Sequence, residues 1–157
     1  MTLLETLTLS GASVTSSTIP GTYKNLQVIV RNFKPATDNT DLNFRYNSDS
    51  NTRYKQSTTM GQSQQSFNST SLQSNNNADN STAPNLSVIN IYDYANTDTW
   101  KFAFTHNITA DGEVSTSNVN CYNFWQVYNQ TSAITTITFF PSSGNFTSGS
   151  ILIYGVS

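Results

Sequence analysis

The sequence predicts an all-β fold, namely an antiparallel β-sandwich of jelly-roll type built from about eight to ten strands. Many short segments alternate apolar and polar residues, which is the pattern of strands that bury one face. Gly, Pro, Asn and Asp separate these segments at intervals of about 8–12 residues, as turns do in sandwiches. No segment combines a helical period with capping residues. Together these observations indicate strands joined by turns throughout the chain.

The composition of the chain agrees with this fold class. Its 157 residues suit one domain, which we expect to span residues 1–157. Charged residues make up only 10% of the chain, against about 25% in an ordinary globular domain. Ser, Thr and Asn replace them and form roughly two-fifths of the sequence. Because these side chains compete with a helical backbone for hydrogen bonds, they disfavour helices, whereas Thr and aromatic residues favour strands.

The alternation is clearest in residues 23–33. Leu26, Val28 and Val30 share one face of this predicted strand, which we expect to be buried. Ile29 is an apolar residue on the opposite face, so we expect that face to be partly covered as well. Similar alternation predicts the other strands, in residues 3–9, 42–47, 53–60, 85–94, 100–104, 115–128, 134–140 and 150–156.

Residues 62–84 break the pattern, because nearly all of them are Ser, Gln, Asn or Thr. Phe67 and Leu72 are their main apolar anchors. Such a stretch buries too little apolar surface to order itself as core, so we expect a long polar excursion on the surface of the same domain. A short strand or turn is expected only around residues 67–72.

The charge of the chain argues against a nucleic-acid partner and against a membrane partner. The formal net charge is -2, and no basic stripe is present that would neutralise phosphates. The cationic residues interleave with aspartates and predict a solvated surface of mixed sign; they are Lys24, Arg31, Lys34, Arg45, Arg53, Lys55 and Lys101. No apolar run approaches the roughly 20 residues of a membrane-spanning helix, and the N-terminus does not resemble a secretory signal.

The sequence predicts no catalytic residues. His106 is the only histidine, and no serine lies in a Gly-x-Ser-x-Gly turn that would mark it as a nucleophile. Asp93 or Asp98 could orient the imidazole, but the simpler expectation for His106 is a polar residue at a strand end. Cys121 is the only cysteine and has no base or cation beside it in the sequence, so we expect a buried structural thiol.

No metal and no cofactor is predicted either. One Cys and one His do not make a zinc site. Residues 38–41 and 47–51 supply side-chain oxygens, but neither segment matches a calcium-binding loop, and Asx turns explain both segments equally well. The glycines are scattered as turn residues and form no phosphate-binding loop.

Trp100 and Trp125 have two alternative interpretations. Exposed tryptophans can form a platform for a sugar ring, but both lie in alternating strand segments, so we expect them to pack in the core. Glu5 and Glu113 are the only glutamates, which leaves glycoside hydrolysis by paired carboxylates poorly supported. We therefore expect a protein that binds and assembles and is not an enzyme.

Several blocks of the chain carry a family resemblance, and they lie at residues 19–31, 41–49, 53–54, 90–96, 137–146 and 151–156. In these blocks the sequence resembles the small structural proteins of tailed-bacteriophage virions. The blocks cover nearly the whole chain outside residues 62–84. Ser48 is a departure, since the resemblance leads us to expect Asn-Gly-Asp where this chain has Asn47-Ser48-Asp49. A serine there puts the tight turn in doubt or requires a different one.

The resemblance implies a β-sandwich on the capsid or the tail. The chain starts at its first strand, stops at its last and lacks the coiled-coil or collagen-like shaft of a fibre, so we favour a capsid decoration (cement) protein on the outer surface of the virion. Its expected partners are the major capsid protein and copies of itself in a homo-oligomer, such as a trimer around a capsid symmetry axis. Copies that meet there would bury strand faces such as the one that carries Ile29.

The alternative within the same resemblance is a tail-fibre tip or adsorption protein. Such a protein would bind a host-surface glycan through exposed aromatic, Asn, Ser and Thr side chains. A free carbohydrate-active enzyme is a third and weaker alternative. The copy number per virion separates the first two, because a decoration protein approaches the major capsid protein in abundance and a tail protein is present in far fewer copies.

Overall fold

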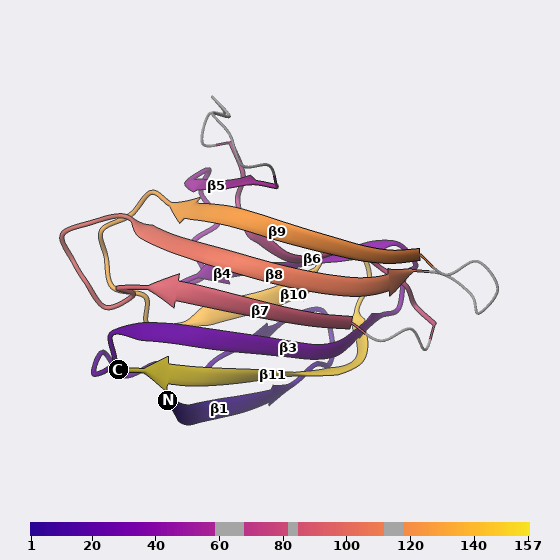
Figure 1. The fold of residues 1–157 in the computed structure, drawn as a ribbon, viewed down its shortest axis with the longest axis horizontal. Helices are drawn as coiled ribbons and strands as arrows, with labels where there is room; N and C mark the ends of the chain where they lie inside the picture. The colour runs from indigo at the N-terminus through magenta and orange to yellow at the C-terminus, as the bar shows by residue number, and fades with distance from the viewer. Residues whose placement is uncertain (59–67, 82–84, 112–117) are drawn as a thin grey trace.

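The computed structural model describes residues 1–58, 68–81, 85–111 and 118–157, and it confirms the predicted all-β sandwich (Figure 1). The described residues form eleven strands and no helix. The strands are β1 (Thr2–Thr8), β2 (Val14–Thr15), β3 (Asn25–Pro35), β4 (Thr40–Tyr46), β5 (Tyr54–Ser57), β6 (Leu72–Ala78), β7 (Asn85–Tyr92), β8 (Lys101–Asp111), β9 (Asn118–Tyr128), β10 (Ile137–Pro141) and β11 (Phe146–Val156). Their number exceeds the expected range because β2 is very short and β6 lies in the polar stretch.

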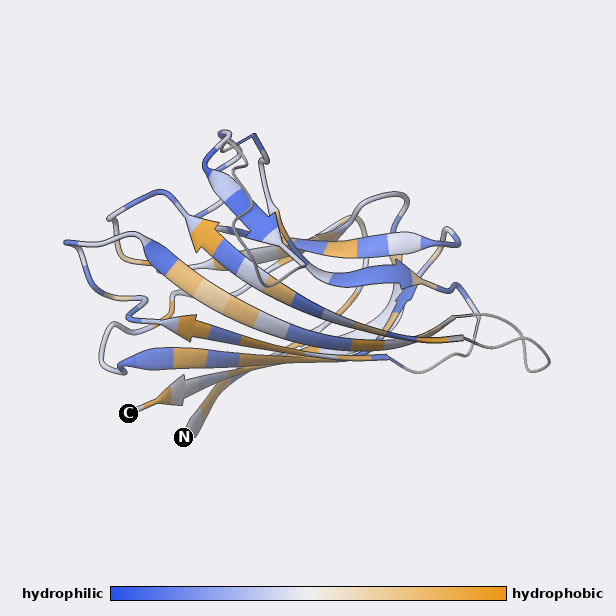
Figure 2. Ribbon diagram, turned by 45° about the horizontal axis from the view of Figure 1, so that its top comes forward, coloured by the Kyte–Doolittle hydropathy of each residue, from blue (hydrophilic) through white to orange (hydrophobic). Residues whose placement is uncertain are grey.

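Two antiparallel sheets stack on each other. The large sheet has the strand order β1-β11-β3-β7-β8-β9-β5, and the small sheet has the order β2-β10-β4-β6. In Figure 1 the large sheet lies in front of the small sheet. The two chain termini lie close together because the first strand pairs with the last strand. Figure 2 shows the twist of the large sheet and the hydrophobic residues that recur along its strands.

The hydrophobic core lies between the two sheets, mainly beneath β3, β7 and β11 of the large sheet. The predicted buried face of β3 is confirmed, since Leu26, Val28 and Val30 are all buried. In the small sheet, Phe44 packs against Phe139 with ring centroids 5.9 Å apart. A side chain of this size contributes roughly 1.5–3 kcal/mol when it leaves water, so apolar burial holds this half of the sandwich together.

Under β8 and β9 the interior is polar. The residues that meet there, here called the polar interior, are Gln56, Gln73, Ser74, Asn75, Ser87, Thr105, Asn107, Thr109 and Gln126. Gln126 is the central member, because its Nε2 donates to the carbonyl oxygen of Gln73 at 2.6 Å and its Oε1 accepts from the hydroxyl of Thr105 at 2.8 Å. Nearby, the hydroxyl of Thr109 donates to Oδ1 of Asn75 at 3.0 Å. Hydrogen bonds therefore join the two sheets in this half of the molecule.

The polar interior corrects the expectation for residues 62–84. Residues 72–78 form strand β6, which pairs with β4 and contacts β8 and β9 through the hydrogen bonds just described. The expectation was based on apolar burial alone, whereas amide and hydroxyl groups order this strand by satisfying one another. Residues 62–67 and 82–84 lie outside the described residues, so the expectation for them stays a prediction.

Strands β7, β8 and β9 form two successive hairpins. The predicted turn between β7 and β8 is present, and the backbone NH of Asn96 donates to the carbonyl oxygen of Asp93 at 3.0 Å. At the other end, Asp111 of β8 pairs with Asn118 of β9. The dipeptide Asp111-Gly112 favours a hairpin turn between them, but residues 112–117 lie outside the described residues, so this turn stays a prediction.

Lys101 does not belong to the solvated surface on which the sequence placed it. Only 1% of this residue is exposed, and its ammonium donates to the carbonyl oxygens of Thr99 at 2.8 Å and Thr131 at 2.9 Å. Burial lowers the pKa of Lys101, while the negative charges of Asp93 and Asp98 act in the opposite direction. The side chain thus ties the start of β8 to the loop that follows β9.

The turn after β4 forms despite the serine at position 48. Asn47 and Ser48 both have positive φ, 51° and 54°, and the backbone NH of Asp49 donates to the carbonyl oxygen of Tyr46 at 2.9 Å. Two successive left-handed residues with this hydrogen bond make a tight turn of type I′. Asn tolerates this conformation better than Ser does, so the strain of the turn lies mainly at Ser48.

We expect Ser48→Gly to raise the free energy of unfolding by about 1 kcal/mol, because glycine adopts positive φ without steric cost. Urea unfolding followed by far-UV circular dichroism measures the change. Ser50→Gly is the matched control, since Ser50 lies in the same exposed turn but is not a positive-φ residue. Equal effects of the two substitutions would show that turn strain is not the cause.

Candidate binding surface

The large sheet has one face that is turned away from the small sheet, and we call it the outer face (Figure 1). An antiparallel sheet with an uncovered face usually carries polar residues there. This outer face instead carries large apolar side chains that are between 42% and 66% exposed, namely Leu3, Leu86, Tyr92, Phe102, Ile108, Val119 and Trp125. Half-buried apolar residues lie between them: Ile29, Val88, Phe104, Val127, Leu152 and Tyr154. Apolar side chains therefore lie on the outward side of β1, β11, β3, β7, β8 and β9.

Strand register places these side chains in rows across the sheet. Residues opposite each other on neighbouring antiparallel strands point to the same side. Ile29, Val88, His106 and Asn123 form one such row across β3, β7, β8 and β9. The rows on either side are Gln27, Asn90, Phe104 and Trp125, and then Arg31, Leu86, Ile108 and Cys121. Ile29 is half-buried, but its face is turned away from the small sheet, so the expectation that this face is partly covered stays a prediction.

At the β5 side of the outer face, aromatic rings surround a hollow of about 580 Å³, here called the aromatic hollow. Trp125 and Phe104 lie with ring centroids 4.3 Å apart. Tyr92 and Phe102, which are opposite each other on β7 and β8, line the hollow as well. Its other lining residues are Lys55, Gln56, Ser57, Ala103, Gln126 and Val127. Most of the side chains that point into the hollow are therefore apolar.

The polar side chains within the outer face bond to each other. Nε2 of Gln27 donates to Oδ1 of Asn90 at 3.1 Å. Nδ1 of His106 lies 2.8 Å from Oδ1 of Asn123 in a second hydrogen bond, and the edge of its ring meets the ring of Phe104. These residues thus satisfy part of their hydrogen-bonding capacity without a solvent molecule or a partner.

The structure corrects the expected position of His106. It lies in the middle of β8 and points outward, whereas the sequence placed it at a strand end. Its side-chain hydrogen bond goes to Asn123 and not to Asp93 or Asp98, the acids considered as orienting groups. The described residues therefore do not assemble an acid and a base around this imidazole.

Three further residues lie on the surface although the sequence placed them in the core. Trp100 and Trp125 are 45% and 46% exposed, and Cys121 is also exposed. Alternation shows that two faces of a strand differ, but it does not show which face turns inward. In β8 the inward residues are largely polar, such as Thr105 and Asn107, and in β9 the inward side carries Gln126 between Phe124 and Tyr128. The usual choice of the apolar side as the buried side was therefore wrong for β8, and in β9 apolar residues lie on both sides.

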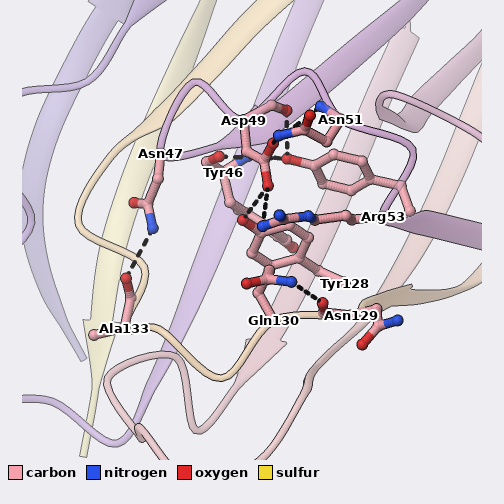
Figure 3. Close-up of polar contacts among 10 residues, drawn as sticks. Tyr46, Asn47, Asp49, Asn51, Arg53, Tyr128, Asn129, Gln130 and Ala133 are labelled. Carbon is pink, nitrogen blue, oxygen red and sulfur yellow. Dashed lines mark hydrogen bonds and ion pairs between the residues drawn. The ribbon is translucent and has the colours of Figure 1, made fainter.

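A second cluster of polar residues lies at the turn after β4 (Figure 3). The carboxylate of Asp49 accepts from the backbone NH of Asn51 at 3.0 Å and from the hydroxyl of Tyr128 at 2.8 Å. Arg53 forms an ion pair with the same carboxylate at 3.4 Å. Tyr54 stacks on Tyr128 with centroids 4.8 Å apart. The cluster fastens the turn to the end of β9, and the oxygens considered for calcium serve an Asx turn there.

The ionisation of this cluster follows from its packing. Burial acts to raise the pKa of Asp49, but the hydrogen bonds from Asn51 and Tyr128 and the charge of Arg53 bring it below its ordinary value of 3.8. Burial raises the pKa of Tyr54 to about 12. Burial, together with the hydrogen bond to Asp49, also raises the pKa of Tyr128. Asp49 is therefore held as a carboxylate, and both tyrosines are held as neutral donors.

We expect acid to remove the stabilising contribution of Asp49. Because its pKa is lowered in the folded state, this contribution is present above pH 3.8 and is lost as the pH falls through the folded pKa. The unfolding free energies of the wild type and of Asp49→Asn should differ by about 2 kcal/mol at pH 7 and converge towards pH 2. Asp38→Asn is the control, since Asp38 is exposed and its carboxylate accepts hydrogen bonds from the adjacent Asn39. A difference that does not depend on pH would contradict the expected linkage.

The described residues bring together no group of three or more His, Cys, Asp or Glu residues that could hold a metal ion. In the same part of the chain, no helix is long and apolar enough to cross a membrane.

Fold and surface together define the class of this protein as an antiparallel β-sandwich with one apolar, uncovered sheet face. Exposed apolar patches larger than a few hundred Å² mark surfaces that contact other molecules. No family model matches the chain, and comparisons with curated proteins and with solved structures also find no match. The outer face is therefore the feature of the structure that bears on function.

Proposed function

We propose that this chain is a structural protein of a tailed-phage virion, and specifically a capsid decoration (cement) protein that acts as a homo-oligomer. The observation that carries the proposal is the outer face, where large apolar side chains stay about half exposed in the single chain. A face of this kind suits a protein whose work is to associate with other proteins. The residue blocks that resemble small virion proteins support the phage origin and the major capsid protein as partner.

The test is the composition of purified virions. We expect this chain in an amount close to that of the major capsid protein, measured by quantitative mass spectrometry. Heads that lack the chain should lose resistance to heat, and the purified protein should restore it when added back. A copy number near that of tail components, with heads of unchanged heat resistance, would refute the decoration function.

A second candidate function is glycan binding at the tip of a tail fibre, and the aromatic hollow favours it. Tyr92, Phe102 and Trp125 are each about half exposed and line the same hollow. Aromatic ring faces offer an apolar surface on which the C–H face of a sugar can stack. Host surface polysaccharide should then bind to the wild type and to Trp100→Ala but not to Trp125→Ala. Equal binding by both variants would exclude this site.

A further inference from the structure

We propose that a second copy of this chain covers the outer face of the large sheet. The inference deepens the proposed function, because it rests on a homo-oligomer and assigns the surface through which its copies meet. It concerns the described residues of β3, β7, β8, β9 and β11, with the row Arg31, Leu86, Ile108 and Cys121 near its centre.

The apolar character of the outer face is the first argument. Leu86, Ile108 and Val119 are aliphatic residues that are 42%, 51% and 66% exposed on three neighbouring strands. None of them belongs to the aromatic hollow, so a small ligand bound in the hollow would leave them in water. A partner that covers all three of them must span at least β7, β8 and β9.

The size of the face is the second argument. The strands β3, β7, β8, β9 and β11 have 11, 8, 11, 11 and 11 residues. With a rise of about 3.3 Å per residue and a spacing of about 4.8 Å between strands, they present roughly 800 Å². Stable protein interfaces of standard size bury about 800 Å² on each partner. Two sheets can also pack face to face at a separation of about 10 Å, as they do inside any sandwich. One outer face laid on another therefore suffices for a stable contact without any further surface.

The distribution of polar groups is the third argument. Gln27 pairs with Asn90, and His106 pairs with Asn123, within the face itself, so burial would leave fewer of their polar atoms without a partner. The outer-face rows across β3, β7, β8 and β9 contain no Asp and no Glu. The permanently charged residues of the outer face are Arg31 and Lys34 on β3 and Lys55, which lies three strands away on β5. Most of the face therefore offers an acidic partner no positive charge, whereas a second apolar face of the same kind complements it.

The experiment is sedimentation equilibrium of the purified full chain at about 100 µM, where a complex of micromolar dissociation constant is mostly assembled. We expect the wild type to be an oligomer and Ile108→Lys to be a single chain of unchanged circular dichroism. Ile108 is half exposed in one chain, so a lysine there does not disturb the core. Ser13→Lys is the matched control, because it adds the same charge at an exposed site away from the outer face and should remain oligomeric.

Cys121 gives an independent readout because it lies opposite Ile108 on the neighbouring strand and is exposed in the single chain. Its thiol should react with a maleimide about tenfold more slowly in the wild type at about 100 µM than in the wild type diluted to about 0.1 µM, as for a complex of micromolar dissociation constant. A monomeric wild type, an oligomer that Ile108→Lys leaves intact, or a thiol whose reactivity does not change on dilution would overturn the inference.

These outcomes are separate from those of the proposed function. If the chain is abundant on heads but monomeric in solution, the decoration function is supported and self-association through the outer face is refuted. If the chain is an oligomer but absent from heads, self-association is supported and the decoration function is refuted. If a host polysaccharide binds to the oligomer and Trp125→Ala abolishes the binding, the hollow is open in the assembly and the face-to-face arrangement is wrong.

Discussion

Gly149→Ala is expected to destabilise the fold by about 4 kcal/mol, which combines backbone strain with overpacking. Gly149 has a φ of 125° in β11, where the register with β3 shifts. A Cβ at this position would lie 2.8 Å from the carbonyl oxygen of Asn32, 2.9 Å from Cδ1 of Leu9 and 3.0 Å from Cα of Phe33. Two of these atoms belong to the backbone of the neighbouring segment, so the strand itself has to move. Urea unfolding at pH 7 measures the loss.

Gly11→Ala is the matched control for this prediction. Gly11 also has a positive φ, 67°, but no atom lies within 4 Å of the position that a methyl group on its Cα would occupy. Its substitution should therefore cost only the backbone strain, about 1 kcal/mol. If the two variants lose the same stability, close packing between β11 and β3 is not the reason for the glycine.

Gln126→Leu is expected to destabilise the fold by about 3 kcal/mol, because it leaves several buried polar groups without partners. Leucine keeps most of the volume of glutamine but accepts no hydrogen bond from Thr105 and donates none to Gln73. The loss should appear in urea unfolding, and protection from hydrogen exchange should decrease in β6. That location follows because Gln126 is one of the groups that hold β6 over the large sheet.

A double-mutant cycle separates hydrogen bonding from packing at this site. Thr105→Val alone leaves Oε1 of Gln126 without the donor at 2.8 Å. In Gln126→Leu combined with Thr105→Val both partners are apolar, so the pair should recover about 1 kcal/mol relative to the sum of the single changes. Gln27→Leu on the outer face is the control and should change stability by less than about 1 kcal/mol. Strict additivity in the cycle would mean that the hydrogen bond contributes nothing.

The two halves of the sandwich explain why some strands were predictable in full and others only in part. In β3 and β4 the inward residues are apolar and the outward residues are mostly polar, so the alternation indicated both the strand and its buried face. In β8 the inward residues are Thr105, Asn107 and Thr109, and the outward ones include Phe102 and Ile108. Alternation is equally strong there, but hydrophobicity points to the wrong face.

The same reason accounts for what the sequence missed about the candidate surface. Trp125 and Cys121 were expected in the core because a solitary strand offers no sign of what it packs against. Their exposure depends on the position of β6, whose hydrogen-bonding residues occupy the interior under β8 and β9. A stretch such as Ser74 and Asn75 has no pattern that distinguishes a buried polar strand from a surface loop.

The sequence by itself determined that this chain is built from strands joined by turns in an all-β fold, because a period of two residues and the turn signals are local properties. Only the tertiary structure decided which side of each strand is buried, and thereby that Trp125, Ile108 and their neighbours form an uncovered apolar face. The physical reason is that burial depends on what lies opposite a strand. Here a polar strand, β6, lies opposite β8 and β9, and apolar residues such as Ile108 and Trp125 face outward.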